Sequence, residues 1–409
     1  MIETSTLSNG ITIALERLPY VQSAAVGVWI RAGAIDETEH AGISHFIEHM
    51  MFKGTQRRSA KTIAEDIDRI GGSINAFTGK EATCYYVKTQ SEHIGKSIDV
   101  LADMFSGSVF DPTEMEKEKN VVIEEMNMIE DSPEDLGHDL ICEAVFSGSE
   151  LGHSVIGTKD SVTAITRDDI FAYLASRYVA GNIVISVAGN FDPAAVRALL
   201  EEGFGAVRGG GSARSIRPSE FVPETIRRTK DIEQTHLFLG RRGTAMDADD
   251  YYTFSLYNGI LGGGMSSRLF QNVREDKALA YSVYSMNNAF TDDGLFMVYA
   301  GVGSDKEREA KDAILAEIAG MTAARIPDDE LSKAKEQSKG AYVFGQESIS
   351  TRMFATGRNL LLLGRTFSQE EIMRGIDAVT PDDIGRIAQS YADPAGYTSV
   401  VISSDSAAV

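Results

Sequence analysis

The sequence is poor in cysteine and has no long apolar run. Cys84 and Cys142 are its only cysteines, and neither belongs to a CxxC pair, so the sequence indicates neither a disulfide framework nor a thiolate zinc site. No segment is apolar for long enough to cross a bilayer, and the first residues lack the basic and apolar regions of a signal peptide. We therefore expect a cytoplasmic protein without membrane insertion.

Positive charge is also scarce. The chain has 39 lysines and arginines against 60 acidic residues, which gives a net charge of -21 and a pI of about 4.8. Such a chain repels phosphate backbones, so we expect no binding to nucleic acid. Hydrophobic residues make up 43% of the chain, an ordinary value for a soluble globular protein, and 409 residues are too many for one compact core. We predict two domains.

The chain contains one order of predicted elements twice. In each half, a strand leads to two helices, then to two strands, and then to two long helices. A segment rich in glycine, proline and arginine separates the halves. We predict an α+β protein of two tandem homologous α/β-sandwich modules, each with helices on a mixed, mostly antiparallel sheet. The predicted boundaries are 1–210 for a catalytic zinc-binding domain, 211–230 for a linker and 231–409 for the second module.

The main motif is His45-Phe46-Ile47-Glu48-His49, which lies in a segment with helical spacing of apolar residues. Two histidines four residues apart project from one face of a helix and can reach one zinc ion at about 2.0–2.1 Å. Glu48 lies on the same face and suits a general base for a metal-bound water. The alternative is a pair of surface histidines with a helical ion pair. Apolar neighbours argue against it, because buried His and Glu need a metal or a partner.

A catalytic zinc needs a third protein ligand. The predicted helix 113–129 carries Glu118 and Glu125, which are seven residues apart and share one stripe. The stripe alone leaves Glu118, Glu125 or both facing the metal, and a solvated acidic face is the alternative. In the second half, Ser255, Asn258 and Gly259 align with the residues of the zinc motif. We therefore predict that only the first module keeps the metal site.

At this point the sequence resembles the pitrilysin or insulinase-type metallopeptidases, in particular the subunits of the mitochondrial processing peptidase and their bacterial relatives. The resemblance covers nearly the whole chain. It rests on the inverted HxxEH order and on four blocks: GISHFIEHMMFKGT at 42–55, GGSINAFTGKEATCYY at 71–86, EKEKNVVIEEM at 116–126 and SSRLFQNVREDKALAYSV at 266–283.

The resemblance implies roles for further residues. It makes His45, His49 and Glu125 the ligands of one Zn²⁺ per chain, with Glu118 as a catalytic companion. It also implies that the strand 73–78 binds an extended peptide along its edge. On that strand it assigns Asn75, Ala76 and Phe77 to substrate binding.

In the second half, Arg274 and Tyr281 match a family pair that binds substrate and stabilises the oxyanion. A chain of this size resembles one half of the large single-chain relatives. The resemblance therefore implies a dimer in which this pair serves the zinc of the partner subunit, as a homodimer or as a heterodimer with a related chain.

We thus predict a zinc-dependent endopeptidase that cleaves extended or unfolded peptides with metal-activated water. Two alternatives are a non-proteolytic core or scaffold subunit of the same fold and a precursor-maturation protease that needs a partner chain. The physiological substrate does not follow from the sequence.

Overall fold

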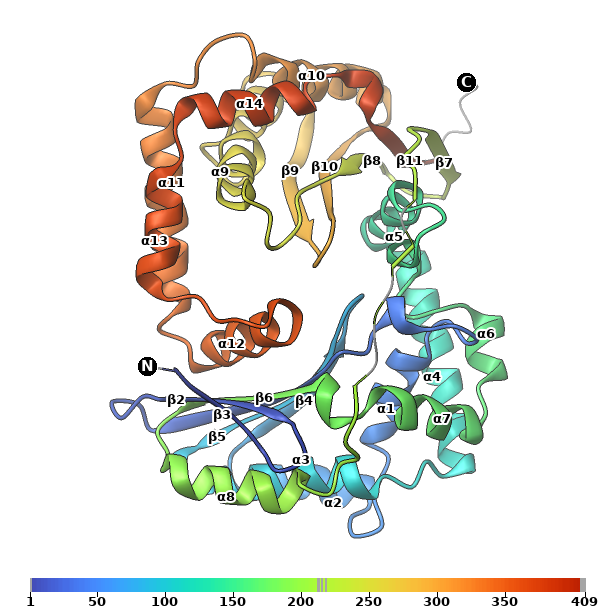
Figure 1. Ribbon diagram of the computed structural model, residues 1–409. Helices are drawn as coiled ribbons and strands as arrows, with labels where there is room; N and C mark the ends of the chain where they lie inside the picture. Colours follow the sequence, from blue (N-terminus) through green and yellow to red (C-terminus); the bar gives the residue numbers. More distant parts are fainter. Residues whose placement is uncertain (1, 212–213, 215, 218, 405–409) are drawn as a thin grey trace. The chain divides into compact units, whose positions relative to one another are not determined.

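The computed structural model describes residues 2–211, 214, 216–217 and 219–404. They form two compact units, each built on one sheet (Figure 1). Neither unit is a continuous stretch of chain. The first unit contains 1–127, 153–216 and 344–366, and the second contains 128–152, 217–343 and 367–409.

The first unit has a six-stranded sheet in the order β1-β2-β6-β3-β5-β4. Neighbouring strands are antiparallel except for the parallel pair β2 and β6. The central strands β3 and β6 read as continuous apolar runs and are almost wholly buried, which is expected for strands covered on both faces. The bounds are β1 Ile2–Thr6, β2 Thr12–Arg17, β3 Ser23–Ile30, β4 Ser73–Thr78, β5 Thr83–Gln90 and β6 Ile183–Gly189.

Helices cover both faces of this sheet. Helix α3 packs on β3 and β5 and contacts α8, while α12 covers β3 and β6 from the opposite face (Figure 1). Helices α1 and α2 lie against β4, the edge strand at the end of the sheet opposite β1. The bounds are α1 Ile43–Met51, α2 Ala60–Asp68, α3 Ile94–Gly107, α4 Pro112–Asp131, α6 Lys159–Ala164, α7 Arg167–Arg177, α8 Pro193–Phe204 and α12 Ile349–Leu363.

The second unit repeats this topology. Its sheet has the order β7-β11-β8-β10-β9, with one parallel pair, β7 and β11, where the first sheet has β2 and β6. The predicted fold class, two homologous α+β modules, is confirmed. The bounds are β7 Thr225–Thr229, β8 Gln234–Arg242, β9 Ala280–Ala289, β10 Gly294–Gly303, β11 Thr398–Ser403, α5 Pro133–Val145, α9 Tyr251–Gly262, α10 Glu307–Gly320, α11 Asp328–Gly345, α13 Gln369–Ala378 and α14 Pro381–Tyr391.

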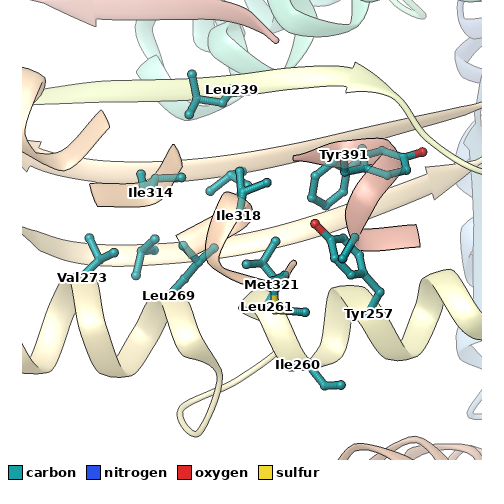
Figure 2. Packing of buried hydrophobic residues seen from close by; sticks show 14 of the residues in the cluster. Leu239, Tyr257, Ile260, Leu261, Leu269, Val273, Ile314, Ile318, Met321 and Tyr391 are labelled. Carbon is teal, nitrogen blue, oxygen red and sulfur yellow. The ribbon is translucent and has the colours of Figure 1, made fainter. Parts of the chain in front are cut away.

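The core of the second unit lies between one face of its sheet and the helices α9, α10 and α14. Figure 2 shows Leu239 of β8, Leu261 of α9, Ile314 of α10 and Tyr391 of α14 in this layer, and all are buried. Burying one such side chain fully contributes about 1.5–3 kcal/mol relative to leaving it exposed.

Two helices pack on the sheet of the other half of the sequence. Helix α5 comes from the first half and lies on β8 and β11, whereas α12 comes from the second half and lies on β3 and β6. Glycines permit the close approach: a Cβ atom at Gly357 of α12 would lie 2.1 Å from Trp29 Nε1, and one at Gly137 of α5 would lie 2.0 Å from Phe238. The compact units therefore differ from the continuous domains 1–210 and 231–409 in these two segments. The reason is long-range packing that sequence order does not display.

Within the described residues, no helix combines the length and the apolar character needed to span a bilayer.

Candidate metal centre

Helix α1 carries the zinc motif, and its apolar side faces the core. Its five large apolar residues are at most 4% exposed: Ile43, Phe46, Ile47, Met50 and Met51. Gly42, the N-cap residue, has a φ of +88° and offers no capping side chain. Glu37 supplies the missing capping acceptor. Its two carboxylate oxygens accept hydrogen bonds from the N–H groups of Gly42 (2.7 Å) and Ser44 (2.9 Å). The start of the motif helix is thus held by a buried carboxylate.

Three predicted residues converge beside α1. The ligand atoms of His45, His49 and Glu125 all lie within 4.8 Å of one another. Glu125 Oε2 is 3.8 Å from His45 Nε2 and 3.5 Å from His49 Nε2. Donors bound tetrahedrally to one zinc at about 2.0–2.2 Å lie roughly 3.3–3.6 Å apart, so the set fits this ion with small adjustments. Among the described residues, no comparable group occurs in the second unit.

Glu118 contacts the ring nitrogen of His49 that is not the candidate ligand atom. Its Oε1 lies 2.9 Å from His49 Nδ1, and its Oε2 lies 2.5 Å from the ammonium of Lys53. A carboxylate on one ring nitrogen fixes the histidine tautomer and leaves the other nitrogen, Nε2, for a metal. Glu118 is only 5% exposed, whereas the side chain of Glu125 is 40% exposed. Both residues of the α4 stripe therefore face the site, in different positions.

Glu48 is held by the neighbouring strand. Thr78 of β4 donates a hydrogen bond to Glu48 Oε2 at 2.5 Å. Burial raises the pKa of Glu48, and the hydrogen bond from Thr78 only partly offsets this effect. A carboxylate with a raised pKa accepts a proton more readily near neutral pH, as a general base must.

The two histidines have different electrostatic surroundings. Burial, and then the neighbouring His49, lower the pKa of His45 to about 4, so His45 is neutral at pH 7. Burial would also lower the pKa of His49, but the hydrogen bond with Glu118 and three surrounding carboxylates raise it overall. Burial would raise the pKa of Glu118, but His49 and Lys53 keep it lowered. The carboxylates that favour a proton on His49 equally favour a cation beside it.

Comparison with known proteins places this chain in a family. The family described as "Insulinase (Peptidase family M16)" matches residues 12–159, and the one described as "Peptidase M16 inactive domain" matches residues 164–338. The chain belongs to peptidase family M16. The first matched region contains every candidate metal ligand, whereas the second matches the inactive domain.

Relatives of this M16 chain span almost its full length. It is 43% identical over 390 residues to the "Uncharacterized zinc protease YmxG" of Bacillus subtilis, which covers 95% of both chains. An uncharacterized zinc protease of Streptomyces coelicolor is 36% identical over 404 residues, covering 95% of this chain and 86% of the relative. The fold matches a protease from Helicobacter pylori with a TM-score of 0.92 at 24% identity, covering 98% and 99% of the two chains. Membership and relatives support a zinc peptidase.

The predicted substrate strand, β4, lies at one edge of the sheet of the first unit. It pairs with β5 and with no other described strand. The Ala76 N–H donates to Asn75 Oδ1 at 2.8 Å, and Phe77 is 40% exposed. Phe77 also makes edge contacts with Trp29 and Phe354 at ring-centroid distances of 5.5 and 5.8 Å. The roles of Asn75, Ala76 and Phe77 in substrate binding stay predictions.

Arg274 and Tyr281 lie together in the second unit. Arg274 belongs to a π-helix, Phe270–Asp276. Its guanidinium carbon lies 4.6 Å from the ring centre of Phe270 and 5.5 Å from that of Tyr281, which is 77% exposed. The structure thus brings this pair together, and its role in catalysis stays a prediction.

Sequence reasoning missed three residues that support the site: Glu37, Lys53 and Thr78. Only weak signals mark them. Thr78 shares one face of β4 with Ala76, by the alternation of a strand. Gly42 has no side chain that could accept from the first N–H groups of the motif helix, which signals that an acceptor must come from elsewhere.

Proposed function

We propose that this chain is a zinc-dependent endopeptidase that cleaves extended or unfolded peptides. The observation that carries the proposal is the convergence of His45, His49 and Glu125 beside a half-buried Glu48 that Thr78 holds in place. His45, His49 and Glu125 would hold one Zn²⁺. When bound, the ion would supply Lewis acidity and lower the pKa of a water towards about 7.

The side chains of α1 and α4 then have separate tasks. Glu48 takes up the proton of the attacking water and can pass it to the leaving amine. Glu118 accepts the hydrogen bond of His49 Nδ1 and so leaves His49 Nε2 as the nitrogen that would hold the ion.

The substrate strand would add to the free edge of β4. Main-chain hydrogen bonds with β4 recognise an extended peptide whatever its side chains, which gives broad specificity. The Asn75 side chain now accepts from the Ala76 N–H. A substrate carbonyl would take that place and release the Asn75 amide for the peptide.

Glu48→Gln tests the mechanism. The variant should bind zinc as the wild type does, while peptide cleavage should fall by about 10²–10⁴-fold because the general base is lost. Glu124→Gln is the matched control, since Glu124 is an exposed residue of α4 and its substitution should leave the site intact. Cleavage of an unstructured peptide and zinc content would be measured together. Full activity of Glu48→Gln would exclude this mechanism, and a wild type that binds no zinc would exclude the proposed function.

We also propose that the enzyme acts as a dimer in which Arg274 and Tyr281 serve the partner's metal centre. Tyr is a neutral hydrogen-bond donor and Arg a positive one, and both suit a developing oxyanion. Mixing Glu48→Gln chains with chains altered at both Arg274 and Tyr281 should restore activity in mixed dimers. No recovery, with mixed dimers shown to form, would refute the shared site.

A further inference from the structure

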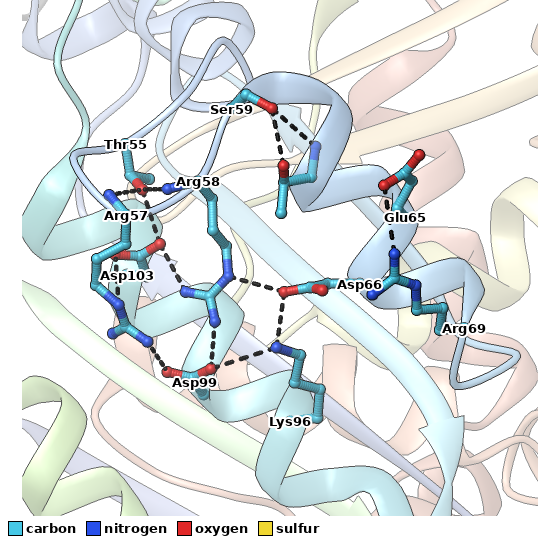
Figure 3. A network of polar contacts seen from close by, with 11 residues as sticks. Thr55, Arg57, Arg58, Ser59, Glu65, Asp66, Arg69, Lys96, Asp99 and Asp103 are labelled. Atoms are coloured by element: carbon cyan, nitrogen blue, oxygen red, sulfur yellow. Dashed lines mark hydrogen bonds and ion pairs between the residues drawn. The ribbon is translucent and has the colours of Figure 1, made fainter.

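The loop after the motif helix ends in a buried arginine. Arg58 is 7% exposed, although it carries a full charge. Its guanidinium donates to Asp103 at 2.7 Å and to Asp66 at 2.9 Å, and it also contacts Asp99 (Figure 3). A buried guanidinium with several carboxylates is held in one orientation, because each of its three nitrogens donates to a different carboxylate.

Thr55 connects this arginine to the loop backbone. Its hydroxyl donates to Asp103 at 2.8 Å and accepts from the N–H groups of Arg57 (3.0 Å) and Arg58 (2.8 Å) (Figure 3). Asp103 lies on α3 and is 2% exposed. The loop is therefore fixed to α3 by a satisfied, buried polar network. We call Thr55, Arg58 and Asp103 together the Arg58 clamp.

The same loop is bonded to the chain just before α4. Gln56 N donates to Gly107 O at 2.8 Å, and Val109 N donates to Gly54 O at 3.2 Å. Helix α4 begins at Pro112, three residues after Val109. The clamped loop thus joins the end of α1, which carries both histidines, to the start of α4, which carries Glu118 and Glu125.

A second connection runs from this loop to the metal site. Lys53 precedes Gly54, and its ammonium lies 2.5 Å from Glu118 Oε2. The other oxygen of Glu118 lies 2.9 Å from His49 Nδ1. A shift of the loop would therefore move both the end of α1 and the partner of a candidate metal ligand.

We infer that the Arg58 clamp is a positioning device that sets the separation of α1 and α4, and thereby the affinity of the site for zinc. The inference rests on the proposed function. None of the three clamp residues touches the candidate ligands, so their effect passes through loop geometry. Zinc affinity depends on how the ligands are held, and loss of a group that hydrogen-bonds to a ligand commonly lowers it by about 10–100-fold. The clamp acts on one such group, Glu118, through Lys53.

A pair of variants at Thr55 tests the inference. Thr55→Val keeps the shape and removes the hydroxyl, whereas Thr55→Ser keeps the hydroxyl. We expect Thr55→Val to bind zinc about tenfold more weakly in competition with a chromogenic chelator. At saturating zinc its kcat should fall with little change in KM, and Thr55→Ser should restore wild-type values. Thr62→Val is the control, since its hydroxyl contacts Ser59 and not Asp103.

The outcomes separate the two proposals. If the wild type binds zinc and Thr55→Val binds it equally tightly, the inference about the clamp is overturned while the proposed function stands. The same holds if Thr62→Val weakens zinc binding as much as Thr55→Val does. A wild type that binds no zinc would overturn the proposed function, and the clamp with it. Arg58→Lys, which keeps the charge and loses the fork, would be measured alongside. If Thr55→Val does not fold, unchanged zinc affinity in Arg58→Lys would equally overturn the clamp.

Discussion

Glu37 offers a quantitative test of how the motif helix is held. Its carboxylate is 6% exposed and accepts the N–H groups of Gly42 and Ser44 at the start of α1. Asp36 is adjacent, and Tyr173 reaches the same place through a 2.7 Å contact with the Ser44 hydroxyl. Burial raises the pKa of Glu37 from 4.5 to about 7, and the backbone hydrogen bonds only partly offset this effect.

The raised pKa of Glu37 determines whether its contribution to stability rises or falls with pH. Folding favours the protonated form of Glu37, so its contribution to stability is fully present below about pH 4.5 and is lost as the pH rises through 7. The difference between 4.5 and 7 corresponds to about 3 kcal/mol, with a slope of up to about 1.4 kcal/mol per pH unit. Glu37→Gln cannot ionise. The free energy of unfolding of the wild type, minus that of the variant, should therefore fall by about 3 kcal/mol between pH 4.5 and 8.

Urea unfolding at several pH values measures this difference. Trp29 is the only tryptophan and lies in the first unit with Glu37, so its fluorescence reports on the relevant unit. A chelator removes the pH dependence of metal binding from both curves. A difference that stays constant with pH, or that grows as the pH rises, would refute the reasoning. Growth would mean that the helix N-terminus stabilises the ionised carboxylate more than burial destabilises it.

Two further predictions concern the metal site and the packing of α12. Glu118→Gln should weaken zinc binding by about 10–100-fold, because His49 loses a charged acceptor and Lys53 its partner; chelator competition would measure this, and unchanged affinity would contradict the role of Glu118. Gly357→Ala should lower the free energy of unfolding by about 1–3 kcal/mol or more, since its Cβ would lie 2.1 Å from Trp29; Gly364→Ala, where no atom lies within 4 Å but φ is +68°, separates backbone strain from crowding in the same urea assay.

The sequence alone determined most features of the motif helix α1. The spacing of Ile43, Phe46 and Ile47 predicted a helix with one buried face, and the structure has it. Spacing of three and four residues is a local property of an α-helix, so it also predicts that His45 and His49 share a face. The repeated order of elements predicted two homologous modules for the same reason, because each element is encoded within its own segment.

Only the tertiary structure decided which groups surround that helix. The contact between Thr78 and Glu48 joins residues 30 positions apart, and that between Glu118 and His49 joins residues 69 apart. No periodicity encodes such pairs, since they depend on how strands and helices pack. Helix α12 is the clearest case: its place on the sheet of the first unit depends on a fit between Gly357 and Trp29 that only folding creates.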